Sequence, residues 1–123
     1  MFSSCAKNNI ENVNIDLGNS DIYSQQDMED AVNVVLNEIR TWESVKKVYC
    51  ISYCGDEMAT EELSYCNILN DKEYTQCVVF ESSFETGNSA ESDGFNSNFR
   101  YDGWQWYLAR TENSDWELLT WGY

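Results

Sequence analysis

Residues 101–123 read YDGWQWYLARTENSDWELLTWGY and carry four of the five tryptophans of the chain. Apolar and polar residues alternate over about 103–111 and again over about 115–121, with the turn-forming residues Glu112-Asn113-Ser114-Asp115 between the two runs. This alternation predicts a β-hairpin that ends the chain. Because aromatic rings bury more apolar area than other side chains, we expect the hairpin to complete a hydrophobic core.

Residues 25–42 predict one long helix. Ser24 is a favourable N-cap residue, and Asp27 completes a capping box and places a carboxylate at the positive end of the helix. Apolar residues at helical spacing form a single stripe, consisting of Met28, Ala31, Val32, Val35, Ile39 and Trp42. We expect this stripe to pack on a sheet.

The remaining elements complete the predicted fold. Residues 45–53 and 74–84 have the β-branched and aromatic content of strands, 60–69 suggest a short helix, and 85–100 form a long polar loop. Together they predict an α+β domain, in which one long N-terminal helix packs on a curved, mostly antiparallel sheet of about four strands, with a short second helix. Within this class we expect an NTF2-like or cystatin-like sheet. The length suits one domain, placed at 16–123, after a flexible tether at 1–15.

The charge of the chain limits its partners. It carries 22 acidic and 7 basic residues, for a formal net charge of −15. Such a charge repels nucleic acid and anionic membranes and favours cations and basic proteins. We therefore expect an unknown protein or small ligand as partner, with cationic chemistry favoured, and no nucleic acid. The plainer interpretation is that the acidic surface keeps the protein soluble.

The first five residues, Met1-Phe2-Ser3-Ser4-Cys5, look like the end of a bacterial lipoprotein signal, in which the cysteine is lipidated. This interpretation predicts an exported protein held at the cell surface through Cys5, and membrane contact only through that anchor. It also predicts that the native gene encodes residues before Met1. The alternative is an ordinary cytosolic start.

The other cysteines are Cys50, Cys54, Cys66 and Cys77. Cys50 and Cys54 fall in one predicted strand, where their Cα atoms would be about 13 Å apart, beyond the reach of a disulfide. A bridge from one of them to Cys66 or Cys77 is favoured instead, although buried thiols can also be ordinary core residues. The chain has no histidine and no Cys-x-x-Cys pair, so we predict no zinc and no cofactor.

Catalysis has little support in the sequence. Without histidine, the usual proton shuttle and the Ser-His and Cys-His nucleophile pairs are missing. Two carboxylate pairs, Asp56-Glu57 and Glu61-Glu62, could serve acid–base chemistry. They lie where turns and helix starts ordinarily carry acids, so we expect no enzyme.

The long polar loop offers a candidate calcium site. Its oxygen-bearing side chains are Glu91, Asp93, Asn96 and Asn98. The order of ligands in a helix-loop-helix calcium site is absent, however, and these residue types are common in any long turn.

The aromatic hairpin offers a candidate ligand surface. By alternation, Trp104 and Trp106 share one face of the first strand and Tyr107 lies on the other, while Leu118 and Trp121 fall on opposite faces of the second. One face of each strand must be core, which leaves at most two tryptophans for a ligand. The candidate binding residues are Trp104, Trp106, Tyr107, Trp121 and Tyr123.

Several segments resemble a known family. They are IYSQQDMEDAVNVVL, YCGDE followed by EELSYCN, YTQCVVFESSF and the ending GWQWYLARTENSDWELLTWGY. These are similar to a family of small bacterial proteins, largely from Firmicutes, whose members are often predicted lipoproteins of no assigned function. The likeness covers about 16–123, and the W-x-W/Y-x-L-x-R…W-x-L-x-x-W-G-Y ending is its most specific part. Members carry Ser-Pro and a glycine-rich stretch where this chain has Glu85-Thr86-Gly87-Asn88-Ser89. The resemblance implies export and a shared fold, and it implies no chemistry.

Three functions follow as hypotheses. The leading one is a small exported binding or interaction module, tethered through Cys5, whose ligand is unknown. The second is an intracellular acidic inhibitor or nucleic-acid mimic that occupies a basic groove. The third is an NTF2-like carboxylate enzyme, which needs an apolar pocket around a carboxylate of raised pKa.

Overall fold

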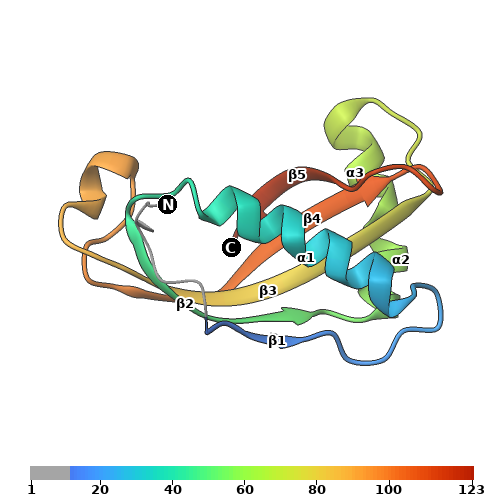
Figure 1. Cartoon of the computed structure of the whole chain (residues 1–123). Coiled ribbons are helices and arrows are strands. Elements are labelled where there is room, and N and C mark those ends of the chain that lie inside the picture. Colours follow the sequence, from blue (N-terminus) through green and yellow to red (C-terminus); the bar gives the residue numbers. More distant parts are fainter. Residues whose placement is uncertain (1–11) are drawn as a thin grey trace, which may run out of the picture.

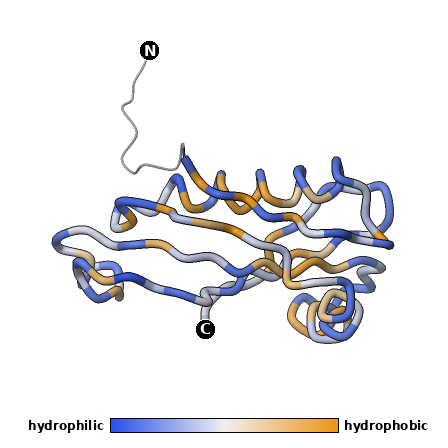
Figure 2. Tube along the Cα trace, turned by 90° about the horizontal axis from the view of Figure 1, so that it is seen from below, coloured by the Kyte–Doolittle hydropathy of each residue, from blue (hydrophilic) through white to orange (hydrophobic). Residues whose placement is uncertain are grey.

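Five strands in sequence order form the sheet of this α+β domain, which a computed structural model describes over residues 12–123. The first two strands are parallel, and the other neighbours are antiparallel. The strands are β1 (Asn14–Asp16), β2 (Val45–Tyr53), β3 (Gln76–Thr86), β4 (Arg100–Arg110) and β5 (Glu117–Gly122). The helices are α1 (Gln25–Ile39), α2 (Asp56–Glu61) and α3 (Leu63–Asn70), and a 3₁₀ turn η1 covers Ala90–Asp93. Helix α1 lies along one face of the twisted sheet and α3 against the other (Figures 1 and 2).

The α+β class is confirmed, and two details of the prediction are wrong. The sheet has five strands, because residues 14–16, at the boundary between the expected tether and the domain, form β1 and pair with β2. Three polar or exposed residues gave no alternation to detect, since the pairing uses the backbone. The short second helix is two helices, because Glu62 has a ψ of −2° and interrupts the α geometry between α2 and α3. Residues 1–11 of the predicted tether lie outside the described residues.

Helix α1 begins as predicted. The Ser24 Oγ accepts the backbone N–H of Asp27 at 3.1 Å, and the Asp27 carboxylate accepts the N–H of Ser24 at 3.2 Å. This capping box satisfies donors that the first turn leaves unpaired. The helix buries one stripe against the sheet, made of Met28, Ala31, Val32, Val35, Leu36 and Ile39.

The helix ends three residues earlier than predicted, at Ile39. The N–H and the hydroxyl of Thr41 both donate to the Glu38 carbonyl, at 2.9 and 2.7 Å. Such i to i−3 bonding tightens the last turn and ends the α-helix. Trp42, the last member of the predicted stripe, therefore lies in the turn that follows the helix.

The C-terminal hairpin forms as predicted, but the prediction of which residues of its second strand face the core is wrong. Alternation puts Leu118 and Trp121 on opposite faces, whereas both lie on the α1 face. Neighbouring residues of β4 pair with Leu118 and Thr120, so β5 carries one extra residue. This β-bulge reverses the alternation and brings Trp121 opposite Trp106.

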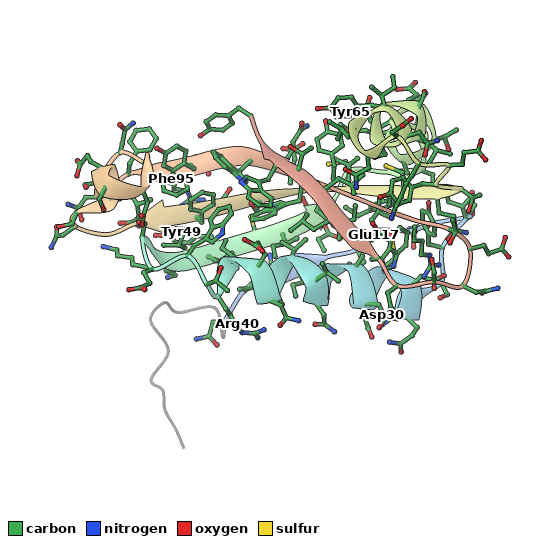
Figure 3. All side chains as sticks on the ribbon, turned by 90° about the horizontal axis from the view of Figure 1, so that it is seen from above. Asp30, Arg40, Tyr49, Tyr65, Phe95 and Glu117 are labelled. Carbon is green, nitrogen blue, oxygen red and sulfur yellow. The ribbon has the colours of Figure 1, made fainter. Side chains whose placement is uncertain are left out.

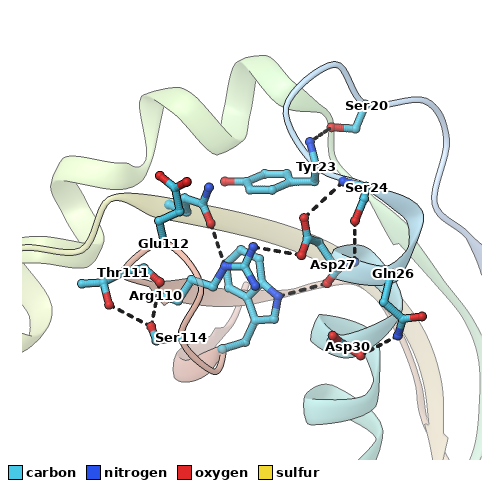
Figure 4. Close-up of polar contacts among 12 residues, drawn as sticks. Ser20, Tyr23, Ser24, Gln26, Asp27, Asp30, Arg110, Thr111, Glu112 and Ser114 are labelled. Atoms are coloured by element: carbon cyan, nitrogen blue, oxygen red, sulfur yellow. Dashed lines mark hydrogen bonds and ion pairs between the residues drawn. The ribbon is translucent and has the colours of Figure 1, made fainter.

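The hairpin is fastened to the start of α1 by a buried cation (Figure 4). The Arg110 guanidinium lies 3.0 Å from Asp27 Oδ1, donates to Gln76 Oε1 at 2.7 Å and sits 4.2 Å from the centroid of the Trp116 ring. The Trp116 indole N–H donates to the Asp27 carbonyl at 3.0 Å. This arrangement, the Arg110 clamp, joins residues 89 positions apart and pairs every charge that it buries.

Candidate ligand-binding groove

Beyond the end of α1, aromatic side chains replace the helix as cover for the sheet. They form an aromatic cluster of Trp42, Phe84, Phe95, Tyr101, Trp104, Trp106, Trp121 and Tyr123. Trp42 is at its centre, with ring centroids 5.1 Å from Trp106, 5.4 Å from Trp121 and 5.8 Å from Phe95. Rings at these separations interact favourably beyond the area that they bury.

The turn after α1 fixes the orientation of Trp42. Its backbone N–H donates to the Ile39 carbonyl at 3.0 Å, and its indole N–H donates to Glu38 Oε2 at 2.9 Å. The Trp42 carbonyl in turn accepts the N–H of Val45, where β2 begins, at 3.0 Å. The ring is thus held from both sides of a tight turn.

The turn after α1 forms one wall of a groove, and the loop between β3 and β4 forms the other. Hydrogen bonds within this loop hold it in place. The Thr86 hydroxyl donates to the Asn96 carbonyl, the Asn98 N–H donates to the Gly87 carbonyl at 3.0 Å, and the Ala90 N–H donates to Ser97 Oγ at 2.8 Å. These bonds place Phe95 against the aromatic cluster. Figure 3 shows Phe95 at the end of the sheet, on the side where α1 stops.

Between these two walls lies an open groove of about 730 Å³. Its lining combines three aromatic rings, two carboxylates and several hydroxyl and amide groups: Thr41, Trp42, Glu43, Ser44, Asn88, Ser89, Ser92, Asp93, Phe95 and Trp121. We call it the acidic-aromatic groove. A pocket with an apolar floor and a few polar groups is the usual form of a ligand site.

The groove has a one-sided electrostatic character. Glu43 and Asp93 line it, and among the described residues that do so there is no lysine or arginine. The Ser44 hydroxyl donates to Asp93 Oδ2 and thereby connects the two walls. One Asp93 oxygen is fixed, so the charge of that carboxylate has a defined position beside the rings.

The five predicted binding residues divide between core, groove and the opposite face. Trp106 is fully buried, and its N–H donates to Ser82 Oγ at 2.8 Å. Trp104 packs inside the aromatic cluster, and its indole nitrogen is the one buried side-chain N or O atom without a hydrogen-bond partner in the described part of the chain. Tyr107 lies on the α3 face, in edge contact with Tyr65.

Trp121 is the predicted binding residue that lines the groove, and its side of the sheet follows from the β-bulge. Tyr123 is 74% exposed and packs on Trp104 beside it. The prediction missed Trp42 and Phe95, which complete the floor. Two sequence features could have pointed to them. Trp42 ends the helical stripe, and Phe95 is the aromatic residue in an otherwise polar loop stretch, 85–98.

Three of the four loop residues proposed for calcium make hydrogen bonds within the protein. Glu91 accepts the Ser97 hydroxyl, Asp93 accepts Ser44, and the Asn98 amide donates to Asn88 Oδ1 at 2.8 Å. Over residues 12–123, no group of three or more acidic or cysteine side chains is arranged to hold a metal ion. These side chains order the loop, which gives the metal prediction no support.

One of the carboxylates proposed for catalysis, Asp56, has a structural role. Asp56 accepts the Ser20 hydroxyl, the Asp21 N–H and the Tyr53 hydroxyl, each at 2.7 Å. Burial alone would raise the pKa of Asp56, but these three hydrogen bonds bring it below its ordinary value. Every described carboxyl group with a shifted pKa is shifted down, which suits ion pairing and capping better than proton donation.

A second hollow of about 710 Å³ lies beside β1 and the start of α1. Its lining is mostly polar and aliphatic, and its one ring, Tyr23, already donates to the Cys77 carbonyl at 2.7 Å. The acidic-aromatic groove is the better candidate because its rings and carboxylates face the same space.

Comparisons with protein-family models, with curated proteins and with solved structures find no match. None of the helices within the described residues is long and apolar enough to cross a membrane. The candidate lipidation site, Cys5, lies outside those residues.

Proposed function

We propose that this protein is a binding module that recognises an organic cation in the acidic-aromatic groove. The ligand group is an ammonium or guanidinium carried on an apolar stem. The observation that carries the proposal is the joint placement of Trp42, Phe95 and Trp121 with two carboxylates, in a lining that contains no basic side chain. Aromatic faces attract cations electrostatically, by about 0.5–1 kcal/mol when exposed and about 2 kcal/mol or more when desolvated.

The molecule already contains an internal version of such a site. At the start of α1, Arg110 sits over the Trp116 ring with the Asp27 carboxylate 3.0 Å away. At the groove, Trp121 and Asp93 line the same space, and no lysine or arginine of residues 12–123 stacks on the Trp121 ring. Rings and carboxylates are therefore present together again, and no basic side chain of residues 12–123 lines this groove.

The net charge of −15 supports this choice of ligand, because the field around the whole protein draws cations toward it. The intracellular mimic hypothesis uses the same charge but needs no aromatic groove. The carboxylate enzyme needs a carboxyl group of raised pKa, and each carboxyl group of residues 12–123 whose pKa is shifted has it lowered. We therefore retain the binding module, within a sheet that we propose to be NTF2-like, and we expect no enzymatic activity.

Export remains part of this proposal, with the anchor at Cys5. The intact mass of the protein isolated from its native cells tests it. A lipidated Cys5 at the N-terminus supports a surface module, whereas an unmodified Met1 would favour the intracellular acidic inhibitor.

Calorimetric titration with choline and with its neutral isostere, 3,3-dimethylbutan-1-ol, tests the groove. We expect choline to bind more tightly, and to bind more weakly as salt is added, since the attraction is electrostatic. The peptides Gly-Lys-Gly and Gly-Arg-Gly, used in parallel, distinguish a basic protein segment from a small amine as the source of the cation. Equal affinity for choline and its isostere would overturn the proposal.

Two variants and one matched control locate the binding. Trp121→Leu and Asp93→Asn should each weaken choline binding about 2- to 5-fold, by loss of a ring or of a charge. Glu112→Gln changes the net charge equally but lies in the exposed turn between β4 and β5, so it should leave the affinity nearly unchanged. An equal effect of Asp93→Asn and Glu112→Gln would show that only net charge matters.

A further inference from the structure

We propose that Cys66 and Cys77 are a site of covalent modification, at which exchange with an external disulfide forms a bridge between α3 and β3. This proposal is independent of the ligand groove, because α3 covers the other face of the sheet. It also replaces the pairing expected from the sequence, in which each of these residues was a partner for Cys50 or Cys54.

The geometry of the two thiols carries the inference. The Cys66 and Cys77 sulfur atoms are 3.3 Å apart, and the residues are 0% and 1% exposed. They are separated by 11 positions, which span the end of α3 and the turn into β3. A disulfide needs the sulfurs at about 2.05 Å, a closure small enough to be met by rotation of the two side chains.

The backbone holds Cys77 in place. Beyond the last residue of β2, the outward N–H and carbonyl of Cys77 lack a strand partner, and the Tyr23 hydroxyl takes that role. It donates to the Cys77 carbonyl at 2.7 Å and accepts the Cys77 N–H at 3.0 Å. Burial raises the pKa of Tyr23 to about 12, so the hydroxyl keeps its proton and both bonds at neutral pH.

The helix that carries Cys66 is fixed just after it. The Asn67 side chain accepts the Tyr74 N–H and donates to the Tyr74 carbonyl at 3.3 Å. The Asn70 amide donates to the Tyr74 hydroxyl at 2.9 Å, and that hydroxyl donates to Glu117 at 2.9 Å. The turn between the two cysteines is thus pinned to α3 and to β5, which keeps the sulfurs together.

Among the cysteines of residues 12–123 whose pKa is shifted, Cys66 is the one whose pKa is lowered. The hydrogen bond with Cys77 lowers the pKa of Cys66, so Cys66 is the better first nucleophile. Cys54 lies instead beside Glu81, and burial with that carboxylate raises its pKa to about 12. Cys66 itself is 0% exposed, and the hollow of about 320 Å³ beside the pair is lined by Cys77 and Leu63, so the exchange requires local opening of α3.

The exchange balances with any low-molecular-weight or protein disulfide as oxidant. The Cys66 thiolate attacks one sulfur of the external disulfide, whose S–S bond breaks and releases one thiolate, leaving a mixed disulfide. The Cys77 thiol then loses its proton and attacks the Cys66 sulfur, which forms the Cys66–Cys77 bond and releases the second external thiol. Two protein thiols are oxidised, one external disulfide is reduced to two thiols, and the two protons pass to the released thiols.

Refolding in a glutathione redox buffer tests the site. The full chain is reduced, unfolded and refolded with glutathione and glutathione disulfide, and peptides are mapped without reduction. We expect one crosslinked peptide joining Cys66 to Cys77, a mass loss of about 2 Da, and a melting temperature about 5–10 °C above that of the reduced protein. The variant C5S/C50S/C54S, which keeps only this pair of thiols, should give the same crosslink and the same mass loss.

Two results would overturn the proposal. One is full alkylation of Cys66 and Cys77 after oxidative refolding and denaturation. The other is a crosslink from either residue to Cys50 or Cys54 as the main product. The wild-type peptide map decides between them even if the triple variant fails to fold.

Discussion

Each end of α1 brings a tryptophan ring and at least one carboxylate to one site. We call the start of α1, with the Arg110 clamp, the closed end, and the acidic-aromatic groove beyond Ile39 the open end. At its start, Trp116 is 6% exposed, with Arg110 stacked on its ring and the Asp27 carbonyl accepting its N–H. Beyond its end, Trp121 is 42% exposed and lines the acidic-aromatic groove. A cation of the chain itself covers the first ring, whereas no lysine or arginine of residues 12–123 lines the groove at the second. A ring with a carboxylate thus stabilises the fold at the first site, and at the second it is where we propose that an external cation binds.

The largest expected effect comes from breaking the closed end. Arg110→Met should lower the free energy of unfolding by about 3 kcal/mol, because Asp27 and Gln76 lose a buried partner. Lys46→Met is the matched control, since Lys46 is exposed and loss of its ion pair with Glu85 should cost less than about 1 kcal/mol. Urea unfolding measures both. Equal losses would show that the clamp is no stronger than a surface ion pair.

The next effect separates two tryptophans inside the aromatic cluster. Trp106→Phe should cost about 2 kcal/mol, because it removes the bond to Ser82 Oγ and leaves a void in a fully buried site. Trp104→Phe should cost at least about 1 kcal/mol less, since no described residue accepts the Trp104 N–H. Thermal and urea unfolding provide the measurement, and the reverse order would contradict the assigned hydrogen bonds.

A smaller effect tests the cap of α1. Ser24→Ala should cost about 1 kcal/mol, by removing the acceptor for the Asp27 N–H. Gln25→Ala, at the neighbouring exposed position, should change stability by less than about 0.5 kcal/mol. Choline binding by Ser24→Ala should match that of the wild type, because the cap lies at the other end of the helix from the groove.

The pH dependence of stability is the subtlest test of the closed end. Burial by itself would raise the pKa of Asp27, but the hydrogen bonds from Arg110 and Ser24 lower it overall. The stabilisation is therefore complete above the unfolded pKa of about 3.9 and is lost as the pH falls through the lower folded value. The stability advantage of wild type over Asp27→Asn should be constant from about pH 7 to pH 5 and shrink in acid. An advantage that persists at the lowest pH would contradict the ion pair.

Local signals in the sequence predicted the closed end better than the open one. Ser24 and Asp27 form a capping box that spacing alone reveals, and the structure has it. Trp42 was expected on α1, but the bonds from Thr41 to the Glu38 carbonyl end the helix first. That difference moves Trp42 from a helix face to the floor of the groove.

Non-local features account for the rest. The face of Trp121 depends on a one-residue register shift between β4 and β5, which alternation within one strand cannot reveal. Strand β1 was missed because three residues that pair through the backbone carry no pattern. The contact of Cys66 with Cys77 depends on how α3 packs on β3, which the sequence does not reveal. A bridge from Cys50 or Cys54 to one of these two residues was therefore favoured from the sequence.

The most direct test of the open end is to follow the five tryptophan indole N–H signals by NMR during a choline titration. The proposed groove predicts that the signals of Trp42 and Trp121 shift with a common saturation curve. The Trp116 signal should stay in place, because Arg110 already covers that ring. A titration that leaves Trp42 and Trp121 unmoved, or that shifts Trp116 equally, would contradict the assignment of the groove as a cation-binding site.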